Sequence, residues 1–477
     1  MSNYCGYIVK IDKLRPHSNA DRLQIATFFG NDVCISLDNQ LGDLGIYFPT
    51  DLQLSEEFCA ANDLVRRKDE NGNPAGGFLE PGKRNVKCIK LRGEKSDGLY
   101  LPISCFDYLN LGCEFAVGDK VDILDGHEIC CKYIPRSNRA IRSSNNGTVK
   151  KQKKVEIAPL FNEHVDTEQL AYNLADFRNG DLVEITLKMH GTSGRTAHLP
   201  KFAGYKDSLG TKAGNAIKNI LNKLTGSRYE EHHDKPIYDW GYVTGTRRVV
   251  LNDFNGPAYY ASNDFREPHA KAFEGKLHKG ETVYYEIVGF QKNGIPIMPS
   301  GDNTKTGDKE FIKQFGKTTV FSYGCHDGGL TEDENHSGVL VKAEPESAMY
   351  VYRMSMMNED GVEVDYTPDY MRYRCEQIGV NTVPVLWKGY IPEHCGSHED
   401  STITPGEWIF NVANRYTDGA DPIGKTHLRE GVVVRIINRP KFKAYKNKSF
   451  HFKCIEGIVK ASADAPDIEE AESFGEN

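Results

Sequence analysis

Strand-like runs dominate this chain of 477 residues, and they follow no regular strand–helix–strand period. Before residue 135, short alternating runs such as GYIVKI, DVCISL, VKCIKL and DKVDIL are separated by Gly, Asp and Asn turns. This spacing indicates an all-β unit of the small-barrel type. From about residue 155, strands and helices mix irregularly, which argues against a doubly wound parallel sheet. The sequence therefore predicts an α+β protein with an N-terminal all-β barrel.

Composition divides the chain into four stretches. Residues 1–135 hold the predicted barrel. Residues 136–154 are polar, basic and rich in Ser and Asn, which fits a linker or a solvated loop. Residues 155–454 form the larger predicted domain. Residues 455–477 end in the acidic run DAPDIEEAESFGEN and predict a disordered tail.

An insertion is predicted within the larger domain at residues 198–237. Its stretch AGNAIKNILNKLTG, from Ala213 to Gly226, has the periodicity of a helix. One face of this helix collects the apolar side chains Ala213, Ile217, Ile220, Leu221 and Leu224. Three lysines lie off that face: Lys212, Lys218 and Lys223. The pattern favours a helix docked on the protein surface over a helix that grips nucleic acid.

The composition suits a soluble globular protein, with 39% hydrophobic and 26% charged residues. No apolar stretch is long enough to cross a bilayer, and the N-terminus has no signal-peptide layout. Twelve cysteines are scattered without a C-x-x-C pair, as expected for reduced thiols. We therefore expect a cytoplasmic, monomeric protein without a membrane partner. The net charge of −8 does not announce a nucleic-acid binder, but local basic runs decide phosphate binding.

The segment GADPIGKT, from Gly419 to Thr426, fits the phosphate-loop pattern G-x-x-x-x-G-K-[ST]. That pattern binds phosphate when a strand feeds the loop and a helix leaves it. Here Pro422 lies inside the loop, and the β-branched run REGVVVRI follows. We therefore predict that this segment is not a phosphate loop and that it leads into a buried strand.

Two strand-like segments deliver single charged groups to an apolar setting. LVEITLKMHGTSGRT places Lys188 at the end of a strand, and Gly191 in the following turn lets a ligand approach the backbone. TVYYEIVGF carries one carboxylate, Glu286, and a charge in so apolar a strand needs a partner.

Three further segments extend this set. MYVYRMSMM places Tyr350 and Tyr352 on one strand face, and Glu430 precedes Gly431 at the start of the valine-rich strand. AYKNKSFHFK places two lysines on one half-buried face, where an anion would stabilise them. The face so predicted carries Lys446, Lys448, Phe450 and Phe452.

The ordered set K-x-H-G, YEIVG, aromatic strand, EGVVVR and K-x-K resembles the covalent nucleotidyltransferase superfamily of ATP-dependent ligases and capping enzymes, over Leu182 to Lys453. His190 stands where DNA ligases and capping enzymes usually carry Asp, and K-x-H-G-T is similar to RNA ligases. The segment from Gly76 to Pro102 resembles the front module of RNA ligase family 5. The segment from His17 to Phe28 resembles the opening of OB-type barrels. The resemblance implies an OB-like barrel followed by a ligase-type, ATP-grasp-like domain of antiparallel sheets with helices.

The resemblance implies an ATP-dependent RNA ligase acting in RNA repair or nick sealing. Lys188 would attack ATP to form lysyl-AMP, AMP would pass to an RNA 5′-phosphate, and a 3′-OH would then displace AMP. The implied cofactors are ATP and Mn²⁺ or Mg²⁺, and RNA is the implied partner.

The resemblance also assigns roles to individual residues. Glu286 would contact the ribose hydroxyl and Glu430 would help to place the metal. The adenine would stack on Tyr352, with Tyr350 beside it and Phe321 or Tyr323 as the fallback. Gly191 would admit the nucleotide, Arg247 or its neighbour Arg248 would meet a phosphate or sugar, and Lys446 and Lys448 would bind the phosphates.

All of these motifs lie beyond the predicted barrel, so we expect the barrel to grip RNA while the larger domain alone can adenylate. Arg84, Lys90 and Arg92 would share one strand face and form a track for backbone phosphates.

Two other functions stay open. A capping-type guanylyltransferase shares the fold and the lysine, but usually carries its OB module after the last motif, and only 24 residues follow Lys453 here. A non-catalytic RNA-binding protein with a degenerate ligase fold is the second alternative.

Overall fold

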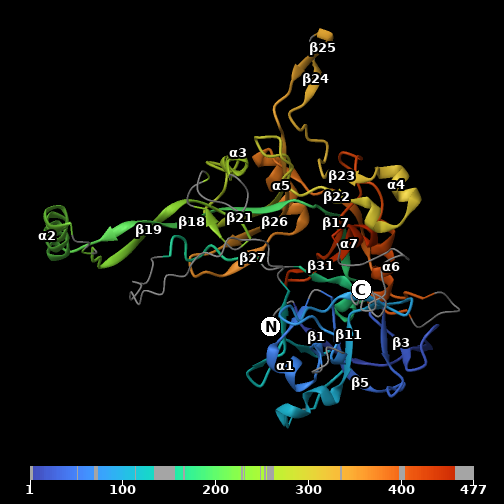
Figure 1. Ribbon diagram of the computed structural model, residues 1–477. Coiled ribbons are helices and arrows are strands. Elements are labelled where there is room, and N and C mark those ends of the chain that lie inside the picture. The colour runs from blue at the N-terminus through green and yellow to red at the C-terminus, as the bar shows by residue number, and fades with distance from the viewer. Residues whose placement is uncertain are drawn as a thin grey trace.

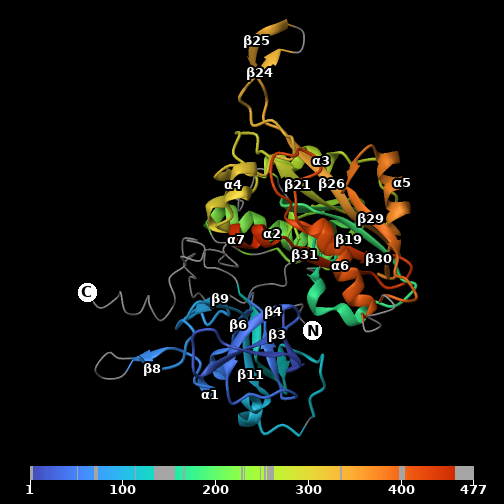
Figure 2. The same ribbon diagram turned by 90° about the vertical axis from the view of Figure 1, so that its right-hand side faces the viewer.

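The computed structural model describes residues 4–50, 52–68, 74–112, 114–133, 156–164, 167–226, 229, 231–247, 249–251, 254, 263–333, 336–396 and 403–456. The chain forms a sheet-rich α+β structure in which small N-terminal sheets lie below two larger sheets (Figures 1 and 2). The predicted linker, residues 136–154, lies outside the described residues.

The N-terminal part consists of short sheets. A four-stranded sheet has the order β11 (Leu99–Pro102), β5 (Leu44–Phe48), β1 (Gly6–Lys10) and β12 (Lys120–Val121), and a three-stranded sheet joins β2 (Leu14–Pro16), β3 (Leu23–Phe28) and β4 (Asn31–Ser36). Four two-stranded pairs complete it: β6 (Leu52–Leu54) with β15 (Cys130–Lys132), β7 (Arg67–Lys68) with β8 (Pro74–Gly76), β9 (Cys88–Leu91) with β10 (Glu94–Asp97), and β13 (Ile123–Leu124) with β14 (His127–Glu128). The described residues give an all-β unit with helix α1 (Glu56–Ala61) and a 3-10 helix (Ile103–Leu109), but no closed barrel.

The predicted phosphate track does not lie on one strand face. Strand β9 is only four residues long, and Arg84 and Arg92 lie outside it in turns, with φ of 46° and 43°. The Arg84 side chain donates a hydrogen bond to the carbonyl of Leu54. Because the residues around Arg84 form turns, the two-residue alternation on which the prediction depended does not hold. Contact of Arg84, Lys90 and Arg92 with RNA stays a prediction.

The larger part contains two sheets. The five-stranded sheet has the order β16 (Glu168–Gln169), β31 (Lys443–Lys448), β30 (Gly431–Ile436), β17 (Leu182–Lys188) and β29 (Val385–Tyr390). The seven-stranded sheet runs β20 (Val250–Leu251), β19 (Lys235–Gly245), β18 (Thr192–Lys206), β21 (Glu281–Gly289), β26 (Ser347–Met357) and β27 (Glu363–Asp365), with β28 (Asn381–Thr382) beside β26. Pairing is antiparallel except for β16 with β31 and β28 with β26.

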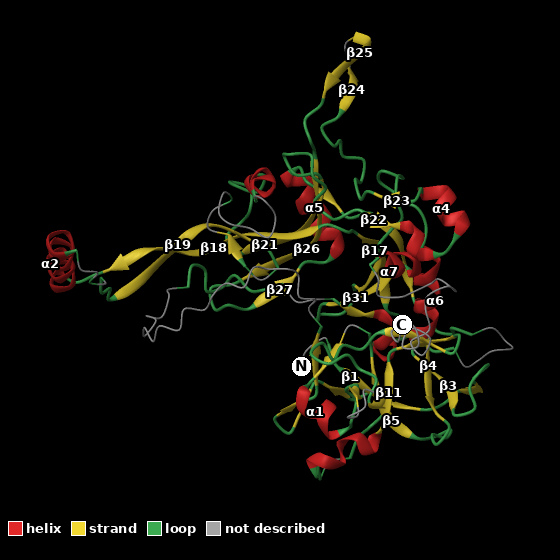
Figure 3. Cartoon of the chain, in the orientation of Figure 1, coloured by secondary structure: helices red, strands yellow, loops and turns green. Residues whose placement is uncertain are grey.

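Helices cover these sheets (Figure 3). Helix α5 (Pro368–Ile378) packs Met371, Cys375 and Ile378 on the seven-stranded sheet, and α6 (Pro405–Thr417) packs Ile409 and Ala413 on the five-stranded sheet. Three shorter helices are α3 (Glu267–Lys271), α4 (Lys309–Phe315) and α7 (Phe450–Ile455), and 3-10 turns lie at Leu170–Tyr172, Leu174–Asp176, Asp264–Arg266 and Asn303–Thr306. None of the described helices is long and apolar enough to cross a membrane.

The sequence explains why α6 begins where it does. Thr404 accepts a hydrogen bond from the backbone N–H of Glu407, whose carboxylate accepts in return from the backbone N–H of Thr404. This capping box satisfies two of the N–H groups that a helix start leaves without partners, and Pro405 has the backbone angle that a first helical residue needs. The helix then ends before Asp418, so the segment that resembles a phosphate loop follows a helix instead of preceding one.

Two hairpins project from the body (Figure 1). Strands β18 and β19 extend beyond their sheet and carry helix α2 (Leu209–Thr225) at the tip, while β24 (Leu330–Asp333) and β25 (His336–Lys342) form the second projection. The prediction that α2 docks on the protein surface is wrong, since Ile217, Ile220 and Leu224 are 59%, 57% and 77% exposed. A short pair, β22 (Gly301–Asp302) with β23 (Thr318–Thr319), lies nearer the body.

The C-terminal boundaries differ from the prediction in two ways. Phe450 and Phe452 do not continue the strand face of β31, because Ser449 caps helix α7 there. Ile455 is buried in that helix and Glu456 pairs with Lys448, so the predicted acidic tail cannot begin at residue 455. The rest of the predicted tail, residues 457–477, lies outside the described residues.

Candidate active site

Three adjacent strands bring the predicted chemical residues into one row. In the antiparallel register Lys188, at the end of β17, is opposite Gly431 at the start of β30, and Gly431 is opposite Lys448 at the end of β31. Lys188, Glu430 and Lys448 therefore lie together at one end of the sheet, although Lys188 is more than 240 residues from the other two in the sequence.

Glu430 is the centre of this row. Its Oε1 lies 2.6 Å from Nζ of Lys188 and 3.3 Å from Nζ of Lys448, and its Oε2 lies 3.6 Å from Nδ1 of His190. Burial by itself would raise the pKa of Glu430, but the charges of Lys188 and Lys448, together with His190, hold it well below its usual range. Glu430 is therefore a permanent anion that can balance a cation but is a poor proton acceptor.

Gly431 permits the close strand contact that this row requires. Its φ is +151°, and a Cβ placed there would lie 2.1 Å from the carbonyl oxygen of Asn447. Only glycine fits this backbone at that spacing. The Glu-Gly pair that opens the valine-rich strand is thus a structural unit, with the carboxylate for charge and the glycine for strand approach.

Glu286 approaches from the other sheet. It lies on β21, and its side chain is half-buried, in contrast to a carboxylate at a solvated strand edge. Burial raises the pKa of Glu286 to about 7, and Glu430 adds to the rise, while Lys188 and Arg247 oppose it. The two carboxyl groups of the site thus differ in charge state although the side chains are chemically alike.

Gly191 is required for close packing between the turn after Lys188 and strand β21. A Cβ at this position would lie 2.5 Å from the carbonyl oxygen of Ile287 and 2.9 Å from Cγ of Glu286. The turn after Lys188 therefore presses directly on β21 and brings the two sheets together. The close approach of a nucleotide to Gly191, which the sequence suggested, stays a prediction.

His190 has a defined position that the sequence did not reveal. Its ring packs edge-on against Phe321 and Phe452, at centroid distances of 4.6 and 4.7 Å. Its backbone N–H donates to the hydroxyl of Tyr323 at 2.6 Å. The ring is therefore held by aromatic contacts from two other segments while Nδ1 faces Glu430.

The aromatic candidates separate into two groups. Phe321 and Tyr323 are 4% and 3% exposed and pack against His190 and His427, so they belong to the core. Tyr350 and Tyr352 on β26 are half-buried at the edge of the same cluster. Burial raises the pKa of both tyrosines, which keeps their hydroxyls neutral. The half-buried pair remains the candidate for stacking, and the fallback residues do not.

Two arginines border the site. Arg247 is exposed and acts electrostatically on Glu286 and Tyr352, whereas Arg248 lies outside the described residues. Sequence reasoning missed Arg266, which is 3% exposed and donates to Thr192 Oγ1 at 2.5 Å and to the carbonyl of Ser193 at 3.0 Å. Arg266 fixes the strand that follows Lys188, and no motif around it would have signalled this role.

The segment Gly419–Thr426 is not arranged as a phosphate loop. The carboxylate of Asp421 accepts hydrogen bonds from the backbone N–H groups of Ile423, Gly424 and Lys425, at 3.2, 2.5 and 3.1 Å. The protein's own buried anion thus occupies the cradle of N–H groups that a phosphate would need. The strand β30, and no helix, follows, in agreement with the prediction.

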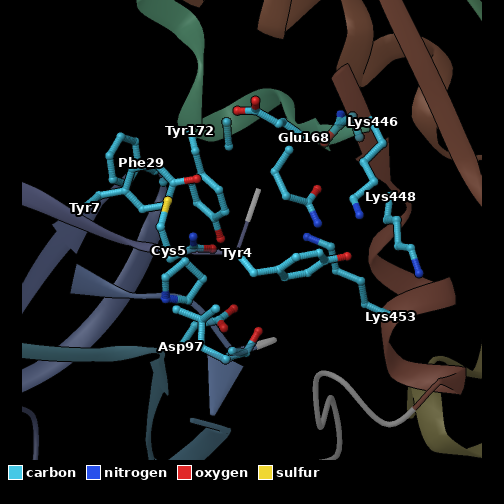
Figure 4. A pocket seen from close by; sticks show the side chains of 18 of the residues that line it. Tyr4, Cys5, Tyr7, Phe29, Asp97, Glu168, Tyr172, Lys446, Lys448 and Lys453 are labelled. Carbon is cyan, nitrogen blue, oxygen red and sulfur yellow. The ribbon is translucent and has the colours of Figure 1, made fainter. Parts of the chain in front are cut away.

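A cavity of about 180 Å³ lies beside Lys446 and Lys448, where the N-terminal part meets strand β31. Figure 4 shows Lys446, Lys448 and Lys453 on one side of it and Tyr4 of the N-terminal part facing them. Nζ of Lys446 lies 5.7 Å from the centre of the Tyr4 ring. The N-terminal part is therefore in direct contact with one of the predicted phosphate-binding lysines.

A divalent cation fits the donor set near Glu430. Ligand atoms of His190, Glu430 and Glu456 all lie within 4.8 Å of one another, and each comes from a different segment. Glu456 was not predicted, because it lies in the stretch that reads as an acidic tail.

Neither a protein-family model nor a curated protein matches this chain. Among solved structures, the Naegleria gruberi RNA ligase with PPi has a TM-score of 0.51 and 16% identity, with 94% of this chain and 98% of that chain covered. A mutant of that ligase with ATP and Mn gives a TM-score of 0.49 and 16% identity, with 96% and 98% covered. The first of these matches shows that the chain shares the overall fold of that RNA ligase over nearly its whole length.

Proposed function

We propose that this chain is an ATP-dependent RNA ligase that joins RNA 3′-OH and 5′-phosphate ends through a covalent lysyl-AMP. One observation carries the proposal: Lys188, Glu430 and Lys448 meet in one row of three strands, with the Lys188 amine 2.6 Å from the Glu430 carboxylate. The fold shared with Naegleria gruberi RNA ligase supports it. The assignment to RNA ligase family 5 and the OB identity of the N-terminal part belong to the same proposal.

The first step requires Lys188 as a neutral amine. Its Nζ forms a bond to the α-phosphorus of ATP while the bond from that phosphorus to the bridging oxygen of the β-phosphate breaks. Pyrophosphate leaves, and the attached nitrogen releases one proton to water. Lys446 and Lys448, at the end of β31, suit the negative charge that builds on the phosphates. A divalent cation would supply further charge stabilisation at the phosphates.

The remaining residues position the nucleotide. Glu286 faces the site from β21 and would accept a hydrogen bond from a ribose hydroxyl. Tyr352 would stack on the adenine, with Tyr350 beside it. Arg247 would meet a phosphate or sugar. The second and third steps transfer AMP to the RNA 5′-phosphate and then release AMP as the 3′-OH bonds to that phosphate.

RNA would bind across the junction of the two parts. The N-terminal part would contribute Arg84, Lys90 and Arg92. The lysines at the end of β31, Lys446 and Lys448, would face the reacting RNA ends. Because Tyr4 contacts Lys446, we propose that the N-terminal part influences adenylation as well as RNA binding. This proposal differs from the expectation, based on the order of the motifs, that the larger domain adenylates alone and the N-terminal part only binds RNA.

Labelling with radioactive nucleotide tests the proposal against both alternatives. A ligase acquires acid-labile AMP from ATP and afterwards seals a nicked duplex with RNA ends. A capping-type enzyme acquires GMP from GTP instead, and a non-catalytic RNA-binding protein acquires neither. Absence of covalent AMP from folded protein supplied with Mn²⁺ or Mg²⁺ would reject the proposal.

A further inference from the structure

We propose that helix α2, at the tip of the β18–β19 hairpin, docks on an anionic lipid bilayer and lies in the plane of its surface. Figure 1 shows α2 as the outermost described element at the left, so a flat surface can reach it without meeting the body. The contact goes beyond the proposed ligase activity and does not depend on it. The expectation of no membrane partner came from the lack of a spanning stretch, and a helix that lies on a bilayer needs none.

The apolar side chains of α2 form one stripe along the helix. Four of them follow the i, i+3, i+4, i+7 spacing that places side chains on one face: Ile217, Ile220, Leu221 and Leu224. Leu209 extends the stripe at the start of the helix. All five are exposed, from 40% for Leu221 to 87% for Leu209. A continuous apolar stripe left in water indicates an interaction site.

Hydrogen bonds to the protein's own chain turn this stripe outward. The Asn215 side chain donates to the carbonyl of His232 at 2.6 Å and accepts from its backbone N–H at 2.9 Å. Asn222 makes the same pair of bonds with the backbone of Tyr229, at 2.9 and 2.6 Å. Both asparagines lie on the side of the helix opposite the apolar stripe. The arrangement of an ordinary surface helix, with its apolar face packed and its polar face in water, is therefore reversed.

The charge of α2 favours an anionic surface. The helix carries Lys212, Lys218 and Lys223 and no acidic residue. Lys212 and Lys223 border the stripe, where their apolar stems can lie on it while the ammonium groups reach lipid headgroups. Glu231, on the segment that returns from the helix, is held on the polar side by Asn219, which donates to its carboxylate at 2.6 Å. The face offered to a partner is therefore apolar with a positive border.

The same features disfavour other occupants. The α2 helix of a second copy would bring the lysines of both helices together, where like charges repel. RNA bases stack on aromatic rings, and the stripe is entirely aliphatic. An apolar groove with an acidic border on another protein would offer similar contacts, but the position of α2 at the end of an arm favours a flat surface over an enclosing one.

Flotation of the full chain with vesicles tests the proposal, without nucleotide or RNA. The vesicles are phosphatidylcholine alone or phosphatidylcholine with about 30% phosphatidylserine. We expect wild type to float with the anionic vesicles and to bind the neutral ones at least about tenfold more weakly. Binding to the anionic vesicles should weaken as salt concentration rises, because salt screens the lysines.

Two variants of α2 separate the contributions of the stripe and of its border. Ile217→Ser combined with Leu224→Ser should weaken binding to anionic vesicles about tenfold or more, since both side chains would enter the bilayer surface. Lys212→Gln combined with Lys223→Gln should weaken binding to anionic vesicles and leave binding to neutral ones unchanged. Leu340→Ser is the matched control, because Leu340 is 64% exposed on the other projecting hairpin, and it should change nothing.

Three results would overturn the proposal. Wild type that floats with neither vesicle would show that the stripe has another occupant, such as a protein groove. Undiminished flotation of the Ile217→Ser, Leu224→Ser variant would show that α2 is not the contact. Self-association of wild type that this variant abolishes, without flotation, would assign the stripe to a second copy. Lysyl-AMP formation is assayed separately and should be equal in all variants, so a failed ligase assignment gives a different result.

Discussion

Glu286 and Glu430 are held in different charge states by their surroundings. Glu430 lies against Lys188 and Lys448 and has a pKa well below the usual range, while burial raises the pKa of Glu286 to about 7. Glu430 stays negatively charged and balances the neighbouring cations, whereas Glu286 changes its charge near pH 7. This difference follows from which sheet each residue occupies, and it is invisible in the sequence.

The raised pKa of Glu286 predicts a stability effect that depends on pH. The unfolded chain ionises this group near pH 4.3, but the folded chain ionises it near pH 7, so folding is penalised as pH rises through this window. Glu286→Gln removes the penalty. After discounting for the partial exposure of Glu286, the variant should be more stable than wild type by about 2 kcal/mol at pH 8 and nearly equal to it at pH 4.

Urea unfolding without metal or nucleotide measures this difference, with Glu274→Gln, at an exposed carboxylate in the loop after α3, as the control. Equal destabilisation by Glu286→Gln at both pH values would contradict the charge state assigned to Glu286.

The contact of Gly191 with β21 gives a second prediction for a single residue. A Cβ at Gly191 meets backbone at 2.5 Å, so Gly191→Ala should destabilise the protein by about 1–3 kcal/mol. Gly214 lies in helix α2 with open space around it, so Gly214→Ala should stabilise by about 0.5–1 kcal/mol. Thermal unfolding of both variants measures the opposite signs, and a neutral Gly191→Ala would mean that the turn can move away from the sheet.

At the scale of elements, the register of β17, β30 and β31 gathers the site, and the loop before β30 supports it. Asp421 fills the backbone cradle of Gly419–Thr426 with its own carboxylate. A phosphate loop would depend on Lys425 to bind its ligand. This loop depends instead on Asp421 to hold its backbone.

Substitution in this loop separates the two interpretations. Asp421→Ala should destabilise the fold by about 3 kcal/mol, because three backbone N–H groups lose their acceptor. Lys425→Ala should leave adenylation within about tenfold of wild type, a cost of at most about 1.4 kcal/mol. Loss of several orders of magnitude in Lys425→Ala, with its circular dichroism unchanged, would restore the phosphate-loop interpretation.

The sequence was sufficient for the elements whose signal is local. The strand character of Gly431–Ile436 and the shared face of Lys446 and Lys448 follow from residue type and two-residue spacing. Two wrong predictions arose where turns or caps interrupt a spacing: Arg84 and Arg92 lie in turns, and Ser449 starts a helix before Phe450. The docking of α2 was wrong for another reason, because periodicity identifies an apolar helix face but not what covers it. His190 as a packed ring and Glu456 as a site residue needed the tertiary contacts, because no periodicity brings these positions together.

At the scale of the whole molecule, the N-terminal part is attached through an aromatic cluster. Tyr172, just after β16, contacts Tyr7 and Phe29 at centroid distances of 4.9 and 5.3 Å. Lys120 of the N-terminal part pairs with Glu168 on β16 at 2.6 Å. Since β16 is hydrogen-bonded to β31, this attachment continues into the strand of Lys446 and Lys448.

Tyr172→Ala should weaken the attachment. We expect the two parts of wild type to unfold in one calorimetric transition and those of Tyr172→Ala to unfold in two, with a loss of about 2–3 kcal/mol in the less stable part. Tyr390→Ala, at a tyrosine that is 65% exposed on edge strand β29, serves as the control. A single transition in Tyr172→Ala at the wild-type temperature would show that the aromatic cluster does not couple the two parts.

The proposed reaction requires Lys188 to become covalently bound to AMP. Mass spectrometry of peptides after incubation with ATP and Mn²⁺ locates the modified residue directly. We expect AMP on the peptide that contains Lys188, and no AMP on Lys188→Arg protein whose circular dichroism matches wild type. AMP on another lysine, or undiminished labelling of Lys188→Arg, would contradict the assignment of Lys188 as the nucleophile.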